Sequence, residues 1–202
     1  MTINMTNSEA LVAGVDEAGR GPLAGPLLCA AVILHPDRPI IGLRDSKQLK
    51  AGARDALRSE ILAKAWAYAI IEISHNEVDK LNIFQATMEG MRRAVAALNP
   101  TPTGALIDGN KVPPGLICQA RAIVKGDQLE TCISAASILA KTTRDALMQE
   151  HAKTYPGYGF EIHKGYPTPA HLAALNALGA CAIHRRSYAP VRKVLLMQAE
   201  LF

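Results

Sequence analysis

No apolar run in this sequence approaches the roughly 20 residues that cross a bilayer, which argues against a transmembrane helix. The amino-terminal segment MTINMTNSEA has neither the basic stretch nor the apolar stretch of a secretion signal. The four cysteines show no Cys-x-x-Cys spacing and stand largely in apolar surroundings, which predicts buried free thiols in a reducing compartment. We therefore expect a cytoplasmic protein without a membrane partner.

Acidic residues are absent from the whole stretch between Ile162 and Ala199. The same stretch supplies positive charge through Lys164, Arg185, Arg186, Arg192 and Lys193. The formal net charge is only +4, but its uneven distribution predicts a basic surface suited to a polyanion. The alternative is an ordinary solvated surface.

The chain has no internal repeat and no low-complexity segment. With 202 residues, of which 49% are hydrophobic, it can bury the core of one domain. We expect a monomer with a single domain over residues 1–202, in which about 155–202 form a small helical carboxy-terminal region.

The run GVDEAGRGPLAGP, from Gly14 to Pro26, places two acids at the end of an apolar segment and directly before glycine-rich backbone. If the apolar segment is a buried strand, Asp16 and Glu17 lie at its exposed end, where α/β proteins place their chemistry. Glycines after the acids would let a ligand approach the main chain closely. The alternative is a tight turn with two solvated acids.

Two further acids repeat this pattern. Asp108 follows the apolar residues of GALIDGN, and Asp127 follows those of ARAIVKGDQLE. If the strands are neighbours, the four carboxylates converge, and such a cluster needs protons or cations to neutralise it. Hard oxygen ligands without nearby His or Cys favour Mg²⁺ or Mn²⁺ over zinc.

The pattern of the whole chain predicts an α/β fold. Expected strands lie near residues 10–16, 27–34, 66–74, 103–108 and 120–124, with helices in the gaps. The early strands are joined too closely for a helix between them and should be antiparallel, whereas the later ones should alternate with helices. The prediction is a mixed five-stranded sheet flanked by helices.

The helix expected after Asp127 has one packed face and one polar face. Its polar stripe consists of Glu130, Ser134, Ser137, Lys141, Arg144 and Asp145. Small hydroxyls followed by Lys141 and Arg144 would let a phosphate backbone lie close and be bound. The alternative is an amphipathic surface helix without a ligand.

Six motifs in this order resemble bacterial ribonuclease HII. They are DEAGRGPLAGP, DSKQL (45–49), LIDGN, KGD followed by SAASILAKTTRD (134–145), HKGYPT (163–168) and HRRSYAPV (184–191). The resemblance runs from about Val12 to Val194, and the chain lacks the long amino-terminal extension of the related type III enzymes. It implies a ribonuclease H-like fold and an endonuclease for RNA–DNA hybrids and for ribonucleotides embedded in duplex DNA. Cleavage on the 5′ side of the ribonucleotide should leave 5′-phosphate and 3′-hydroxyl ends.

The resemblance also implies roles for the acids. A phosphodiester can be hydrolysed with two divalent cations, Mn²⁺ or Mg²⁺, and we expect Asp16 to bind both of them. Glu17 and Asp108 complete the metal site on the leaving-group side, and Asp127 helps to hold the cation that activates water.

Substrate contacts follow from the same resemblance. Gly19, Arg20 and Gly21 are expected to recognise the 2′-hydroxyl through their backbone, and Tyr166 to pack on the next sugar. Ser46 and Lys47 are expected to contact phosphates, although Ser46 could instead cap a helix. The carboxy-terminal region would bind the substrate together with these residues.

The last five residues resemble a peptide with which bacterial replication and repair proteins bind the sliding clamp. Gln198 would form hydrogen bonds, and Leu201 with Phe202 would fill an apolar pocket. The alternative is that these apolar residues pack the last helix onto the domain. For the whole chain, the residues alone leave open another two-metal phosphotransferase, such as a DNA resolvase, and a nucleic-acid binder without activity.

Overall fold

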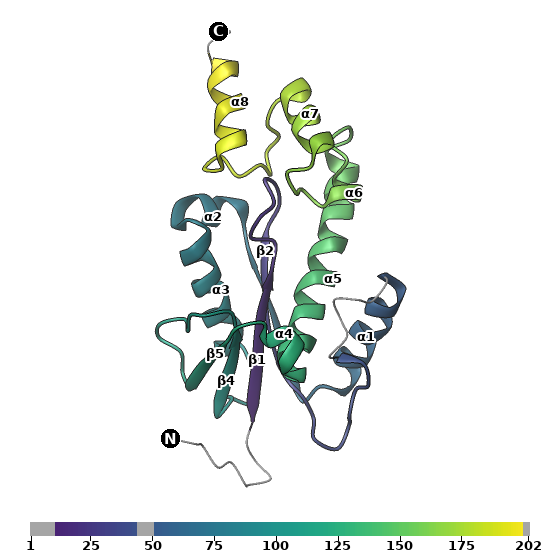
Figure 1. The fold of residues 1–202 in the computed structure, drawn as a ribbon, viewed down its shortest axis with the longest axis vertical. Helices are drawn as coiled ribbons and strands as arrows, with labels where there is room; N and C mark the ends of the chain where they lie inside the picture. The colour runs from purple at the N-terminus through teal and green to yellow at the C-terminus, as the bar shows by residue number, and fades with distance from the viewer. Residues whose placement is uncertain (1–10, 44–50, 200–202) are drawn as a thin grey trace.

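The centre of the molecule is a five-stranded sheet, seen in a computed structural model that describes residues 11–43 and 51–199 (Figure 1). Its strands are β1 (Val12–Ala18), β2 (Leu27–Ile33), β3 (Ala67–Ile73), β4 (Gly104–Asp108) and β5 (Gln119–Ile123), in the order β3-β2-β1-β4-β5. β2 is antiparallel to β1 and β3, whereas β4 is parallel to β1 and β5. The predicted α/β fold with a mixed five-stranded sheet is confirmed.

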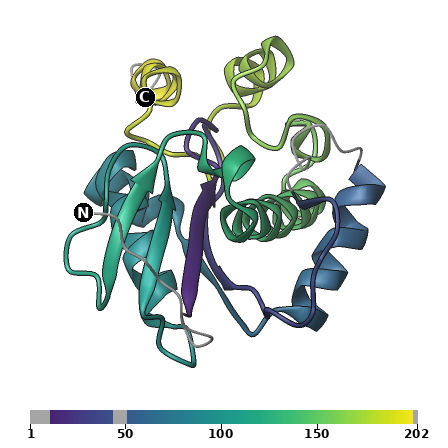
Figure 2. The ribbon, with the colours of Figure 1, turned by 60° about the horizontal axis from the view of Figure 1, so that its bottom comes forward.

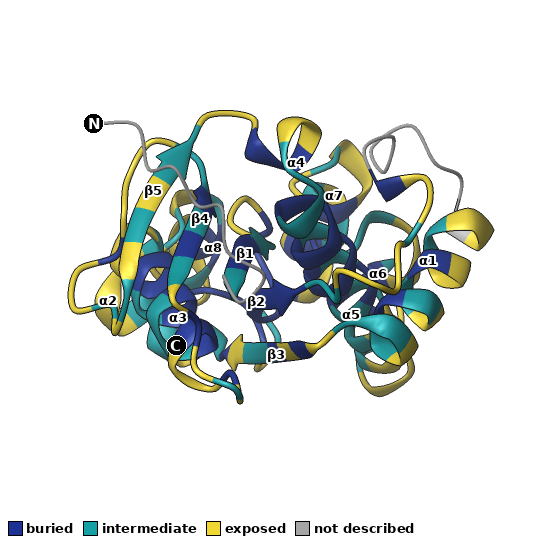
Figure 3. Ribbon diagram, turned by 90° about the horizontal axis from the view of Figure 1, so that it is seen from below, coloured by how far each residue is buried: buried dark blue, intermediate teal, exposed yellow. Residues whose placement is uncertain are grey.

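Helices cover both faces of this sheet. The helices of the described residues are α1 (Ala51–Lys64), α2 (His75–Leu81), α3 (Ile83–Ala96), α4 (Gly126–Leu129), α5 (Thr131–Thr154), α6 (Phe160–His163), α7 (Pro169–Leu178) and α8 (Ala189–Ala199), of which α3 and α5 lie on the two faces. The apolar side of α3 packs on one face, while α5 packs on the other and separates the strands from α1 (Figure 2). β2 is buried along its whole length because its side chains alternate between these two cores (Figure 3).

The connection between β4 and β5 departs from the prediction that helices separate the later strands. α2 and α3 lie between β3 and β4, as expected, but residues 109–118 contain no helix. Pro113 and Pro114 remove amide donors, and Gly109 and Gly115 take positive φ angles of 102° and 71°. These residues exclude a helix between two parallel strands.

A glycine allows α5 to lie directly on β1. A Cβ atom at Gly14 would stand 2.1 Å from the backbone carbonyl carbon of Cys132, so no side chain fits there. Because residues two apart in a strand share a face, Asp16 lies on the same side of β1 as Gly14, toward α5. This close packing sets the position of the first predicted acid.

The glycine-rich segment between β1 and β2 contacts the carboxy-terminal region, which contains α6, α7 and α8. α6, α7 and α8 lie beyond the end of β1 in Figure 1. Backbone hydrogen bonds join this segment to them, from Leu23 to Gly165, from Gly25 to Ile183 and from Arg185 to Leu23. The glycine-rich segment is therefore held between the sheet and the carboxy-terminal region.

In residues 11–43 and 51–199, no helix has the length and apolar character that crossing a membrane requires.

Candidate active site

Three adjacent strands bring the predicted acids to one edge of the sheet. β1 and β4 are parallel, with Val15 paired to Ile107, so the next residue on each strand is an acid. Asp16 and Asp108 are therefore neighbours at the same strand ends. β5 lies beside β4 and leads into α4, which contains Asp127. The sheet register thus explains the convergence that the three motifs predicted.

Asp16 is the most enclosed of the acids on β1 and β4, with 6% of its surface exposed. Burial raises the pKa of Asp16 well above its usual range, and the carboxylates of Glu17 and Asp108 raise it further. Hydrogen bonds from the Ser137 side chain and from the amide of Glu17, at 2.7 Å, oppose this shift. A buried carboxylate beside two others favours a cation as its partner.

Glu17 lies on the opposite side of β1 and faces the outside more than Asp16 does. Burial raises its pKa, the positive charge of Arg20 lowers it, and Asp108 contributes a smaller increase. The Arg20 guanidinium lies 3.4 Å from the Glu17 carboxylate. The Arg20 side chain is 51% exposed, so water screens its end of the ion pair and Arg20 can exchange this partner for an anionic ligand.

Asp127 is tied to the strand-end acids through its backbone. Its amide donates a hydrogen bond of 3.3 Å to the Asp108 carboxylate, and its own side chain is buried, with 2% exposed. Lys125, just before α4, adopts a left-handed conformation with φ 57°. This turn directs the chain from the end of β5 back toward the acids.

The oxygen donors of this site suit a hard divalent cation. Asp16, Glu17 and Asp108 interact electrostatically, and burial together with its acidic neighbours raises the pKa of Asp16. Across residues 11–43 and 51–199, no three His, Cys, Asp or Glu side chains already stand in a metal-binding arrangement. The donor chemistry suits Mg²⁺ or Mn²⁺, and the strand register brings the acids close together without a ready-made arrangement of ligands.

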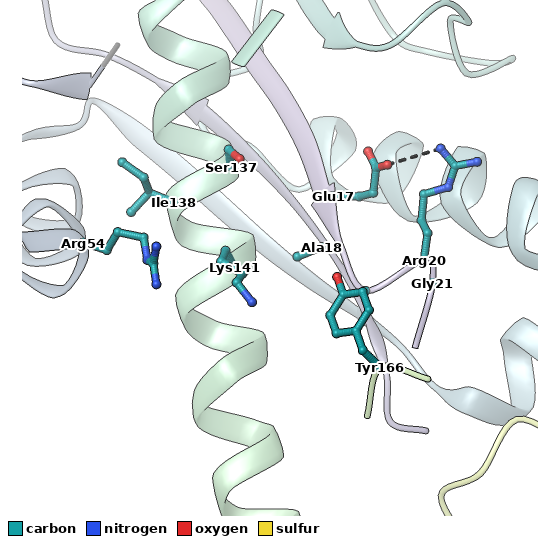
Figure 4. A pocket seen from close by; sticks show the side chains of 10 residues that line it. Glu17, Ala18, Arg20, Gly21, Arg54, Ser137, Ile138, Lys141 and Tyr166 are labelled. Carbon is teal, nitrogen blue, oxygen red and sulfur yellow. Dashed lines mark hydrogen bonds and ion pairs between the residues drawn. The ribbon is translucent and has the colours of Figure 1, made fainter. Parts of the chain in front are cut away.

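A pocket of about 410 Å³ opens beside Glu17 (Figure 4). It is lined by Glu17, Ala18, Gly19, Arg20, Gly21, Arg54, Ser137, Ile138, Lys141 and Tyr166. The structure therefore brings together Lys141, Tyr166 and the turn formed by Gly19, Arg20 and Gly21, which we call the glycine turn. The motifs had singled out all of these residues. Lys141 also forms an ion pair of 2.7 Å with Asp145. Ser46 and Lys47 fall outside the described residues.

Tyr166 lies against the glycine turn. A Cβ atom at Gly21 would be 3.5 Å from the Tyr166 ring, and 41% of the tyrosine is exposed. Its backbone is fixed by hydrogen bonds to the carbonyl of His163, at 2.9 Å, and from the ring of His171, at 2.9 Å. The ring thus forms one wall of the pocket on a fixed backbone.

Arg144 differs from its sequence prediction. Only 1% of it is exposed, and its guanidinium donates to the carbonyls of Pro26, Lys164 and Ala24 at 3.0, 2.9 and 3.1 Å. Burial, and secondarily the charge of Arg185, lower the pKa of Arg144 to about 10. The predicted phosphate contact is wrong because α5 passes beneath the glycine-rich segment at this point, and the guanidinium binds that segment.

The prediction that Arg185 contributes to a basic surface is also wrong. Arg185 is fully buried, with 0% exposed, so it adds nothing to an external positive patch. Sequence reasoning also did not identify Arg54, which lines the pocket from α1. The helical period gives Arg54 no distinctive signal, since a lone arginine on a polar helix face is common. Only the packing of α1 beside α5 brings it to the pocket.

Comparisons with known proteins identify relatives of this chain. A family model described as Ribonuclease HII matches residues 13–191. Ribonuclease HII of Maricaulis maris is 61% identical over 185 residues, covering 91% of this chain and 84% of that protein. Ribonuclease HII of Nitrosococcus oceani is 57% identical over 184 residues, 91% of each chain.

Two solved structures resemble the fold. The ribonuclease H2 structure from Pyrococcus horikoshii OT3 has a TM-score of 0.81 and 30% identity, covering 94% of this chain and 99% of that one. A second structure, described as the PCNA:RNase HII complex from Archaeoglobus fulgidus, has a TM-score of 0.75 and 27% identity, covering 88% and 95% of the two chains.

Proposed function

The chain belongs to the ribonuclease HII family and is a ribonuclease H endonuclease, and from this premise we propose how its own residues cut their substrate. It acts on the RNA of RNA–DNA hybrids and also cuts on the 5′ side of ribonucleotides embedded in duplex DNA. The products carry 5′-phosphate and 3′-hydroxyl ends. The observation that supports this proposal is that acids from three neighbouring strand ends converge beside a pocket. The backbone of Gly19 and Gly21, which have no side chains, lines this pocket.

Asp16, Glu17 and Asp108 would hold two divalent cations, Mg²⁺ or Mn²⁺, with Asp127 beside them. When bound, such ions supply an activated nucleophile and neutralise the charge of the phosphodiester. The chain keeps these acids in place by different means: Ser137 and the amide of Glu17 hold Asp16, and the amide of Asp127 holds Asp108. The acids are thereby oriented before a ligand arrives.

The pocket beside the acids supports binding of a nucleic-acid strand. Arg20, Arg54 and Lys141 line it with positive charge suited to phosphates, and Ser46 and Lys47 are proposed to add further phosphate contacts. The backbone of Gly19, Arg20 and Gly21 is proposed to recognise the 2′-hydroxyl, which distinguishes RNA from DNA. The region over about 155–202 completes the binding surface through Tyr166.

A pair of duplexes tests this function. One carries a single ribonucleotide, and the matched control is all DNA with the same sequence. We expect cleavage of the first alone, at the phosphodiester on the 5′ side of the ribonucleotide, with Mg²⁺ or Mn²⁺ and with no cleavage in EDTA. A DNA resolvase would cut DNA junctions without a ribonucleotide, and cleavage of the all-DNA duplex would refute the proposal.

Tyr166→Ala should lower kcat/KM at a single ribonucleotide by about tenfold, because base or sugar stacking on an aromatic ring contributes about 1–3 kcal/mol. Divalent-cation binding, measured by calorimetry, should stay unchanged because the ring does not belong to the acid cluster. Tyr68→Ala is a matched control, since Tyr68 is 45% exposed but lies on β3. Equal loss of cleavage and cation binding in Tyr166→Ala would indicate a structural tyrosine.

The carboxy terminus is proposed to bind a sliding clamp. The RNase HII of Archaeoglobus fulgidus, whose fold this chain resembles, forms a complex with PCNA. In this chain Gln198 lies near the end of α8 and against Gly179, while Leu201 and Phe202 fall outside the described residues. Recruitment through Gln198, Leu201 and Phe202 would bring the enzyme to newly replicated DNA.

Deletion of residues 198–202 should abolish binding to the bacterial clamp while leaving kcat/KM on a free duplex within about twofold of the intact protein, since the proposed cleavage does not use these residues. Binding is measured by surface plasmon resonance. The double variant Leu196→Ala/Met197→Ala removes two exposed apolar side chains from the same helix and should bind normally. Failure of the intact protein to bind the clamp would exclude this role.

A cytoplasmic location and a monomeric state belong to the same proposal. All four cysteines are free thiols, which suits a reducing compartment.

A further inference from the structure

Arg185 binds the backbone of the glycine turn from inside the protein. Its Nη2 donates to the carbonyl of Gly19 at 2.7 Å, its Nη1 to that of Arg20 at 3.1 Å, and its Nε to that of Gly25 at 3.0 Å. Tyr188 completes the group, because its hydroxyl donates to the Arg20 carbonyl at 2.6 Å and accepts from Arg185 Nη1 at 3.0 Å. The guanidinium also lies over the Tyr188 ring, 5.3 Å from its centroid.

These contacts fix the direction of two peptide groups. A guanidinium buried without partners would be very unfavourable, so the carbonyls must keep facing Arg185. In a planar trans peptide, the carbonyl and the following N–H point in opposite directions. With the carbonyls of Gly19 and Arg20 directed inward, the amides of Arg20 and Gly21 are directed outward, where both residues are exposed. Within the described part of the chain, neither amide donates a hydrogen bond to the protein.

The conformation of Gly19 is part of the same arrangement. Its φ angle is 102°, and a Cβ atom there would lie 2.2 Å from Arg144 Nε. The turn therefore has buried arginine on its inner side and two unengaged amide donors on its outer side, where Gly19, Arg20 and Gly21 line the pocket. Adjacent outward amides suit a ligand oxygen that accepts hydrogen bonds.

The segment that contains Arg185 and Tyr188 is also hydrogen-bonded to α2. The Asp79 carboxylate, on α2, accepts hydrogen bonds from the amides of Arg186 at 2.7 Å and Ser187 at 3.0 Å. Hydrogen bonds therefore hold the segment with Arg185 and Tyr188 on two sides, to the turn of Gly19, Arg20 and Gly21 and to α2.

We propose that Arg185 and Tyr188 are positioning residues for ribose selectivity. They hold the amides of Arg20 and Gly21 in the orientation that donates to the 2′-oxygen of the ribonucleotide. The inference rests on the proposed function, since it assumes that this turn recognises the ribose. Neither side chain contacts the substrate, so both act through the backbone that they orient.

Tyr188→Phe tests this inference with a minimal change, because only the hydroxyl is lost. Single-turnover cleavage of the one-ribonucleotide duplex in Mg²⁺ gives its half-saturating concentration and maximal rate. Competition by the all-DNA duplex in the same solution gives an inhibition constant. The ratio of the inhibition constant to the half-saturating concentration measures ribose selectivity. We expect Tyr188→Phe to lower this ratio by about threefold to tenfold, the effect of losing one or two hydrogen bonds, with the inhibition constant of the all-DNA duplex unchanged.

Tyr158→Phe is the matched control. It also removes a phenolic hydroxyl, which donates to the carbonyl of Gly179 at 2.9 Å away from the pocket. It should lower the melting temperature without changing ribose selectivity. Asp79→Asn, which weakens the outer anchor, should shift selectivity in the same direction as Tyr188→Phe.

The outcomes separate this inference from the proposed function. A wild-type protein that prefers the ribonucleotide duplex, together with a Tyr188→Phe variant of equal preference, overturns the positioning role alone. A wild-type protein that binds both duplexes equally overturns the proposed ribose recognition and this inference with it. A parallel loss of affinity for both duplexes in Tyr188→Phe would indicate a structural role only.

Discussion

Asp16→Asn will reduce cleavage of the single-ribonucleotide duplex to below about one per cent of the wild-type rate. The substitution keeps the shape of the side chain but removes the charge of the acid that interacts with both Glu17 and Asp108. Divalent cations at such a site contribute several kcal/mol to stabilisation of the transition state, and each 1.4 kcal/mol corresponds to a factor of about ten. Single-turnover rates at saturating Mg²⁺ measure the loss, and more than a few per cent of residual activity would contradict the proposed site.

The same variant should be as stable as the wild type or more stable. The pKa of Asp16 in the folded protein is raised by burial and by its acidic neighbours, so the unfolded chain ionises first as pH rises. The wild type therefore loses stability between the unfolded and the folded pKa, and the neutral asparagine does not. Melting temperatures in EDTA should show an advantage of the variant at pH 7.5 that shrinks toward pH 4. Asp37→Asn, in an exposed turn, is the control and should change neither activity nor this pH dependence.

Arg144→Met will destabilise the protein by about 3 kcal/mol, which lowers the melting temperature of a chain of this size by about 6–12 °C. The guanidinium binds three carbonyls, those of Ala24 and Pro26 in buried contacts and that of Lys164 in a partly buried one, and each would be left without this partner. Removal of the buried charge beside Arg185 offsets only part of this cost. Urea unfolding gives the free energy directly.

Arg92→Met is the matched control for this prediction. Arg92 is also an arginine on a helix, but it is partly exposed and pairs with Glu89 at the surface. An exposed ion pair contributes about 0–1 kcal/mol, so the control should keep nearly wild-type stability. If Arg144→Met were as stable as this control and bound the RNA–DNA hybrid more weakly, Arg144 would be the phosphate contact that the helix pattern predicted.

The acids of the site could be predicted from sequence because their positions are encoded locally. Each apolar segment is short, ends in an acid or in a glycine before one, and is therefore recognisable as a strand end. Parallel strands place their carboxyl ends at one edge, so Asp16, Asp108 and Asp127 had to meet there once the strands were neighbours. The pairing of β1 with β4 and of β4 with β5 provided that condition.

The roles of Arg144 and Arg185 were not accessible in this way. Their partners are backbone carbonyls, which every residue has, and those of Arg144 include residues 118 and 120 positions away in the chain. No side-chain pattern marks a carbonyl that faces inward, so the helical period assigned Arg144 to a polar face and composition assigned Arg185 to a basic surface. The sequence by itself determined which acids gather and that glycine backbone stands beside them. Only the tertiary structure decided which basic side chains face the pocket. Long-range packing buried Arg144 and Arg185 beneath the glycine turn and placed Arg54 in the lining of the pocket.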